Sequence, residues 1–218
     1  MQIILIHGAW HGPWCWEGVV SELEAAGHAV VAVELPFTGF AHDAAAARSA
    51  IIEAGPGVVV CGHSYGGLVV DEAVAGLGTD QVSRILYLAA ITNAGLSAMG
   101  RYTIPVAEAI VPTDNGYCAT DLTRAHALFY ADSDPEVVQR ITPLLRPMMM
   151  DGEAFTSRDV GRLDIRSTFV VCSNDGALPA DFQREEAALC SDRVEWPTDH
   201  SPFLTRPAAI ADLLTKTN

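Results

Sequence analysis

The sequence predicts a single α/β domain built on a mostly parallel sheet of about six strands, with helices on both faces. Short apolar runs rich in valine and isoleucine recur along the chain, which is typical of strands buried on both faces of a parallel sheet. Helix-like segments that end near glycines separate these runs, so strand and helix alternate. The chain has 218 residues, of which 50% are hydrophobic, enough to bury one substantial core.

The expected elements follow one another from the N-terminus. The strand-like runs are residues 3–6, 29–33, 58–61, 85–89 and 168–172, with a weaker run at 193–196. The helix-like segments are residues 14–26, 43–54, 67–77, 179–189 and 207–216. Asp43 and Thr205 are expected to be helix N-caps, because their side-chain oxygens can accept hydrogen bonds from the first helical N–H groups.

The alternation stops between residues 93 and 166. This stretch carries five prolines and the run Met148-Met149-Met150, without a clear buried strand. A loop of that length is not structureless in a compact domain, so the stretch predicts a small helical cap or lid inserted within the single domain 1–218. Its position after the fourth strand-like run places it over the C-terminal edge of the sheet, where ligands bind in open α/β folds.

Composition narrows the expected partners. The formal charge of -14 disfavours nucleic acid and anionic membrane surfaces, because phosphate contacts need clustered Lys and Arg. The N-terminus carries no targeting pattern and no apolar run reaches about 18 residues, so we expect a cytoplasmic protein. A homodimer is compatible with the sequence. The five cysteines lack paired spacing, which indicates reduced, structural thiols. The histidines and cysteines also lack the spacing of metal ligands, so we expect no metal and no other cofactor.

A candidate nucleophile lies in Gly62-His63-Ser64-Tyr65-Gly66-Gly67, between a strand-like run and a helix-like segment. A serine on a sharp strand-to-helix turn exposes its hydroxyl at the helix N-terminus, and the flanking glycines leave room for neighbouring segments. The same pattern without a catalytic role would be a glycine-rich turn with a surface serine. The strand-then-helix context favours Ser64 as the nucleophile.

A serine hydroxyl needs a base to remove its proton. His200 lies in a loop between the last strand-like run and the final helix, after both the nucleophile and a candidate acid. Asp175 directly follows the run at 168–172, at the end of a strand from which a carboxylate can reach the histidine, although Asn174-Asp175-Gly176 is also good turn chemistry. Asp199 adjoins His200, so we expect its side chain to point elsewhere.

The chain order Ser64, Asp175, His200 is the order found in α/β-hydrolases. Acyl transfer also needs two donors for the oxyanion. One is the backbone N–H of Tyr65, which follows the nucleophile, and the other is expected from the loop after the first strand, where Ala9 is the preferred residue. His7 in that loop is interpreted as a hydrogen-bonded scaffold residue.

These segments together resemble the plant methylesterase and hydroxynitrile lyase family and its bacterial esterase relatives, in the α/β-hydrolase superfamily. The resemblance rests on His7-Gly8-Ala9-Trp10-His11-Gly12-Pro13-Trp14-Cys15-Trp16, on residues 62–67, on 173–183 and on Asp199-His200-Ser201-Pro202-Phe203. It implies the α/β-hydrolase fold, a triad of Ser64, Asp175 and His200, an oxyanion hole from the Ala9 and Tyr65 amides, and a small cap over an apolar pocket.

The same resemblance bears on the reaction. The lyases of the family carry a threonine directly after the first histidine and a lysine directly after the catalytic one, where this chain has Gly8 and Ser201. Without that cation to stabilise cyanide, hydrolysis of an ester is favoured over carbon–carbon cleavage. A serine rather than an aspartate at position 64 also argues against a dehalogenase.

The pocket is expected to be lined by Trp10, Tyr65, Phe129, Tyr130 and Met148 within the methionine run, which are apolar or amphipathic. Such a lining suggests a small neutral hydrophobic ester or lactone as substrate, although the methionines could simply fill the core of the cap. Two alternatives remain open: a noncatalytic ligand receptor, and a biosynthetic acyl transferase or cyclase on the same fold.

Overall fold

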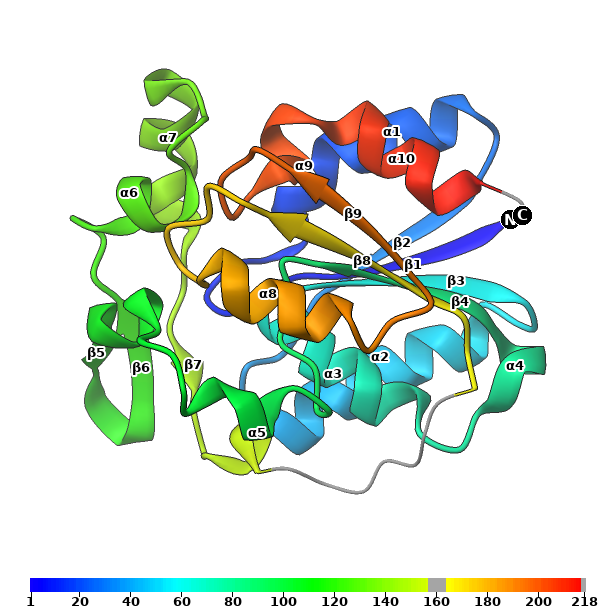
Figure 1. The fold of residues 1–218 in the computed structure, drawn as a ribbon, viewed down its shortest axis with the longest axis horizontal. Coiled ribbons are helices and arrows are strands. Elements are labelled where there is room, and N and C mark those ends of the chain that lie inside the picture. The colour runs from blue at the N-terminus through cyan, green and yellow to red at the C-terminus, as the bar shows by residue number, and fades with distance from the viewer. Residues whose placement is uncertain (157–163, 217–218) are drawn as a thin grey trace.

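Six parallel strands form the central sheet of the computed structural model, which describes residues 1–156 and 164–216 (Figure 1). The strands are β1 (Gln2–Ile6), β2 (Ala29–Val33), β3 (Val58–His63), β4 (Val82–Leu88), β8 (Ser167–Cys172) and β9 (Asp192–Trp196), in the order β2-β1-β3-β4-β8-β9. Every neighbouring pair is parallel. The predicted fold class and all six strand-like runs are confirmed.

Helices cover both faces of this sheet (Figure 1). Alternate residues of each strand belong to two different cores: Ile4 and Ile6 pack on one face, and Ile3 and Leu5 on the other. The first face is covered by α2 (Phe40–Glu53), α3 (Tyr65–Val74) and α8 (Ala180–Ala187), and the second by α1 (Glu17–Ala25) and α10 (Pro207–Thr215). The period of two in the strands therefore serves two buried layers.

The predicted N-caps at Asp43 and Thr205 are wrong. Helix α2 begins at Phe40, and the Asp43 carboxylate, inside its first turn, accepts hydrogen bonds from the Phe37 N–H and the Tyr65 hydroxyl, both at 2.7 Å. Thr205 is the last residue of a separate short helix, α9 (Pro202–Thr205), and α10 begins after Arg206. The Asp43 carboxylate therefore binds groups outside α2 and does not cap the N–H groups of its own helix.

Most of the described residues between β4 and β8 lie beside the carboxyl ends of the strands (Figure 1). They include a three-stranded antiparallel sheet in the order β5-β6-β7 as well as short helices, so the stretch is not purely helical. The strands have only two to four residues, too few to show a period in the sequence. Residues 157–163 of the expected insertion 93–166 lie outside the described residues.

The elements of this stretch and the remaining short helices complete the fold. The stretch holds α5 (Leu96–Met99), β5 (Ile110–Pro112), β6 (Tyr117–Thr120), α6 (Ala125–Phe129), α7 (Pro135–Ile141) and β7 (Met148–Met149). Elsewhere lies α4 (Gly78–Gln81), and single 3-10 turns span Pro13–Trp16, Pro105–Ala109, Asp114–Gly116, Thr142–Leu144 and Glu153–Phe155. No helix in the described part of the chain has the length and apolar character that crossing a membrane requires.

Strand order explains where a site can form. The chain passes from β1 to β2 on one side and then returns to β3 on the other side of β1, so the loops after β1 and β3 diverge at their carboxyl ends. Open α/β sheets bind ligands in the crevice at such a switch point. The cysteines are free thiols; Cys15, Cys61, Cys118 and Cys172 are buried and Cys190 is half-buried.

Candidate active site

Ser64 lies between β3 and α3 in a strained backbone conformation, with φ 53° and ψ −123°. A positive φ is costly for a residue with a Cβ and persists where the surroundings hold it in place. Two glycines permit the close packing around the turn. A Cβ on Gly62 would lie 2.7 Å from the Gly66 carbonyl oxygen, and one on Gly66 would lie 2.7 Å from the carbonyl oxygens of Ile6 and His7.

Asp175 and His200 are in contact although they come from different loops. Asp175 follows β8 and His200 follows β9, and the His200 Nδ1 lies 2.6 Å from the Asp175 Oδ2. The carboxylate also accepts hydrogen bonds from the N–H groups of Ala177 and Leu178 and from the Gln183 side-chain amide. With the Asp175 carboxylate oriented by these donors, the His200 proton sits on Nδ1 and leaves Nε2 free to act as a base.

His63 connects the nucleophile turn to the histidine loop. It precedes Ser64 at the end of β3, is fully buried, and its Nε2 donates to the His200 carbonyl oxygen at 2.9 Å. The two imidazole centroids are 4.6 Å apart. Burial holds the His63 pKa well below its ordinary value, so the ring is neutral. A neutral histidine therefore fixes the main chain of His200 relative to Ser64.

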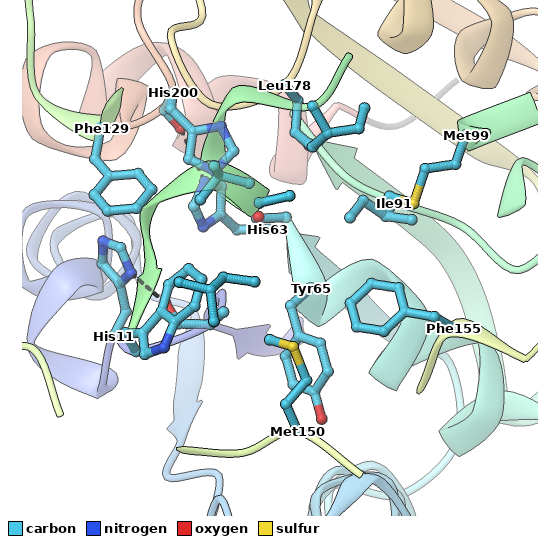
Figure 2. A pocket seen from close by; sticks show the side chains of 17 residues that line it. His11, His63, Tyr65, Ile91, Met99, Phe129, Met150, Phe155, Leu178 and His200 are labelled. Carbon is cyan, nitrogen blue, oxygen red and sulfur yellow. Dashed lines mark hydrogen bonds between the residues drawn. The ribbon is translucent and has the colours of Figure 1, made fainter. Parts of the chain in front are cut away.

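Two further buried histidines orient the loop after β1. The His7 Nδ1 donates to the Gly8 carbonyl at 2.9 Å, while its Nε2 accepts from the Leu35 N–H. The His11 Nδ1 donates to the Ala9 carbonyl at 2.8 Å (Figure 2). Burial lowers the pKa of His7 to about 3 and that of His11 to about 4, so both rings are neutral.

These contacts define the direction of the Ala9 N–H. In a trans peptide the N–H points opposite to the preceding C=O, so holding the Gly8 carbonyl on His7 also fixes the Ala9 N–H. Tyr65 is the first residue of α3, and its N–H has no acceptor within its own helix. His7 thus has the scaffold position expected from the sequence. His11 was not singled out beforehand, and its only signal is its place within the motif of residues 7–16.

Ser64 and His200 both line a cavity of about 290 Å³, together with Ala9 and Tyr65 (Figure 2). Much of the remaining lining is aliphatic or aromatic, and includes Ile91, Met99, Ile104, Ile110, Phe155 and Leu178. None of the residues that line the cavity in the described part of the chain is Lys, Arg, Asp or Glu. The cavity suits a neutral apolar molecule.

The structure brings some of the expected pocket residues to this cavity and leaves others away from it. Trp10 and Phe129 line it. Tyr130 is buried outside the lining, where its hydroxyl donates to the His11 Nε2 at 2.9 Å. Met148 is buried in β7, and Met150, two residues on, lines the cavity in its place. Strand β7 ends at Met149, so Met150 lies beyond it and its side chain is not bound to the alternation of the strand.

Gly8 packs tightly against Ser64 and His63. A Cβ at this position would lie 2.9 Å from the His63 Nδ1 and 3.0 Å from the Ser64 Cβ. A larger side chain in place of Gly8 would displace one of these two residues. Within residues 1–156 and 164–216, no group of three or more His, Cys, Asp or Glu side chains is arranged to hold a metal ion.

Comparison with known proteins finds relatives along nearly the whole chain. The model of the alpha/beta hydrolase family matches residues 3–213. The probable esterase PIR7A of Oryza sativa subsp. indica is 29% identical, with 99% of this chain and 95% of the relative covered. Methyl jasmonate esterase 1 of Vitis vinifera is 26% identical, with coverages of 94% and 92%. The solved structure of polyneuridine aldehyde esterase has the same fold, with a TM-score of 0.82 at 18% identity over 98% of this chain and 97% of that one.

Proposed function

Because the chain belongs to the alpha/beta hydrolase family, we propose that it hydrolyses small, neutral, hydrophobic carboxylic esters or lactones through an acyl-enzyme on Ser64. One observation carries the proposal. The His200–Asp175 contact of 2.6 Å orients an imidazole at the wall of an apolar cavity that Ser64 also lines. The names of the relatives as esterases agree with this reaction class.

In the proposed first step, the Ser64 Oγ attacks the ester carbonyl carbon while its proton passes to the His200 Nε2. The Asp175 carboxylate stabilises the imidazolium that forms. The N–H groups of Ala9 and Tyr65 stabilise the developing oxyanion, and each is set by the local backbone before substrate arrives. When the bond between the acyl carbon and the alcohol oxygen breaks, the proton on His200 passes to that oxygen.

The second step repeats this chemistry with water. His200 takes a proton from the water molecule as its oxygen attacks the acyl carbon, and the proton then returns to the Ser64 Oγ as the acyl–serine bond breaks. The apolar lining selects the acyl and alcohol groups. We assign residues 93–166 the role of a cap over this pocket, since Met99, Ile104, Phe129 and Met150 of that stretch line the cavity.

Lyase chemistry is disfavoured by the same site. Cleavage to cyanide would need a cation near the leaving group, and Ser201 follows the proposed base where a lysine would be required. The tight packing around Gly8 leaves no space for a threonine beside Ser64. Both features support hydrolysis of an ester.

The test is turnover of nitrophenyl esters from acetate to long acyl chains by the wild type, Ser64→Ala and Ser83→Ala. Ser83 lies near the N-terminal end of β4, whereas Ser64 follows the C-terminal end of β3. The Ser83 hydroxyl donates to the carbonyl oxygens of Gly57 and Val58. We expect Ser64→Ala to lose at least about 10³-fold in kcat and Ser83→Ala to retain activity. Mass spectrometry should find the acyl group on Ser64.

Other outcomes would favour the alternatives. Absence of turnover by folded wild type with every ester would contradict the esterase proposal and favour a ligand receptor. Turnover that yields mainly a new ester when an alcohol is added would favour an acyl transferase instead.

A further inference from the structure

We propose that residues 129–132 of the cap, here called the positioning strap, hold both the oxyanion loop and the histidine loop in catalytic register. The inference rests on the proposed function and assigns Tyr130 and Asp132 as positioning residues. The strap runs from the end of α6 past both loops, and contacts each of them through a different side chain.

The first contact holds the ring of His11 in place. The Ala9 carbonyl oxygen can only accept, so the single proton of this neutral ring resides on Nδ1 and is donated to that oxygen at 2.8 Å. The Tyr130 hydroxyl donates to the remaining lone pair, on Nε2, at 2.9 Å. Without this hydroxyl, the His11 Nε2 loses its partner and the ring can turn away from the Ala9 carbonyl. The peptide beside the oxyanion donor would then lose the contact that holds it.

The second contact is reciprocal. The Asp132 N–H donates to the Asp199 carboxylate at 2.9 Å, and the Asp199 N–H donates to the Asp132 carboxylate at 2.8 Å. The other oxygen of the buried Asp199 carboxylate accepts from the Ser201 N–H at 2.9 Å. The residues on both sides of His200 are therefore tied to the strap through Asp199.

At the start of the strap, Phe129 lies against the rings of His200 and His11. Its centroid is 5.8 Å from that of His200 and 5.7 Å from that of His11, and Figure 2 shows its ring beside both. Tyr130 and Asp132 are not among the described residues that line the cavity, so they act on the reacting groups through the residues that they contact, His11, Phe129 and Asp199. Misplacement of a catalytic group by about 1 Å can cost on the order of 10²-fold in rate.

The test compares Tyr130→Phe, Asp132→Ala and Asp132→Asn with two matched controls. Tyr102→Phe removes a phenolic hydroxyl that bonds the exposed Glu185, and Asp121→Ala removes a cap carboxylate that accepts the Thr123 N–H. We expect kcat to fall roughly 10- to 100-fold in Tyr130→Phe and Asp132→Ala, with KM within about twofold of wild type. The Asp132→Asn variant keeps an acceptor oxygen and should recover most of the rate.

A second readout does not depend on ester turnover. A fluorophosphonate reacts when the Ser64 Oγ forms a bond to phosphorus, fluoride leaves, and the serine proton passes to His200. Its labelling rate should fall in parallel with kcat in both variants. ¹H–¹⁵N spectra should show a strongly hydrogen-bonded His11 Nδ1 proton in the wild type and in Tyr102→Phe, and a more weakly bonded, faster-exchanging one in Tyr130→Phe.

The outcomes separate the two proposals. Labelling of Ser64 without hydrolysis of any ester would contradict the esterase proposal while the labelling rates still test the strap. Unchanged labelling rates, an unchanged His11 Nδ1–H signal in Tyr130→Phe, or a raised KM at constant kcat would overturn the strap. Wild type that neither hydrolyses esters nor is labelled would contradict both.

Discussion

Asp175 illustrates how one carboxylate sets the state of the proposed base. Its Oδ1 accepts the N–H groups of Ala177 and Leu178, and its Oδ2 accepts Gln183 and His200. All four neighbours donate, and both carboxylate oxygens accept. An asparagine at position 175 would have to turn its N–H₂ group toward some of these donors.

We predict that Asp175→Asn lowers kcat by on the order of 10⁴ with a small change in KM. The amide can keep its oxygen toward Ala177 and Leu178 only by turning its nitrogen toward His200. The imidazole then places its proton on Nε2 and cannot accept one from Ser64. Steady-state kinetics with a nitrophenyl ester checks this prediction. The control is Asp181→Asn, because Asp181 is exposed and, among the described ion pairs, pairs only with Arg184. Near wild-type kcat in Asp175→Asn would refute the orienting role.

The residues that the sequence indicated are those with strong local signals. Ser64 stands between glycines after an apolar run, and His200 and Asp175 each follow a strand. Tyr130 and Met148 were assigned to the pocket by composition alone, and a side chain's direction depends on packing that composition does not encode. His11 was missed because its partners, the Ala9 carbonyl and the Tyr130 hydroxyl, are brought together only by the tertiary fold.

Helix α8 contributes a buried acid to the start of the cap. The Glu186 carboxylate accepts from the Thr92 N–H at 3.2 Å and from the Thr92 hydroxyl, just after β4. A Cβ on Gly95 would collide with this carboxyl group, so only glycine fits there. Burial raises the Glu186 pKa to about 8. The folded chain therefore keeps a proton on Glu186 at neutral pH, whereas the unfolded chain releases it near pH 4.5.

This difference predicts a pH-dependent stability. Since the folded pKa of Glu186 is raised, its stabilising effect is complete below about pH 4.5 and is lost as pH rises toward 8. Asp71, with its pKa raised to about 6, and the neutral His7 and His11 change the slope mainly below pH 6.5. Between pH 6.5 and 8, we expect the free energy of unfolding to fall by up to about 1.4 kcal/mol per pH unit through Glu186.

Urea denaturation at several pH values should show this slope in the wild type and a flatter one in Glu186→Gln. Exchange of Glu24, which is exposed on α1, for Gln is the control and should leave the slope unchanged. Equal slopes in wild type and Glu186→Gln would rule out a buried protonated Glu186.

Element prediction succeeded where periodicity was long enough to read. The central strands are apolar over four or more residues because both faces are buried, and the helices between them end at turns. The cap strands are too short and too interrupted by proline for such a signal, as in β5, which ends at Pro112. The pairing of β6 with β7 also depends on contacts between residues about 30 positions apart, such as Tyr117 with Met149.

At the scale of the whole molecule, a strongly negative net charge is combined with an apolar site. The formal charge is -14, and the cavity carries no charged lining residue among those described. An anionic ester meets unfavourable potential on approach and finds no cation inside, whereas a neutral ester meets neither obstacle.

We therefore predict that kcat/KM for nitrophenyl hemisuccinate is lower than for nitrophenyl butyrate and rises roughly threefold or more between about 10 and 200 mM salt. The value for the neutral butyrate should change little. The ratio of the two constants across a salt series is the measurement. Salt-independent preference, or preference for the anion, would indicate a cationic subsite.

The buried thiols can report how often different parts of the folded chain open. Only a thiolate reacts with alkylating reagents, and burial raises the pKa of Cys61 in β3, Cys172 in β8 and Cys118 in β6. Each sulfur is protected for as long as its own strand stays closed. Because Cys118 sits in the cap and the other two sit in the central sheet, their separate alkylation rates time how often the cap opens and how often the sheet does.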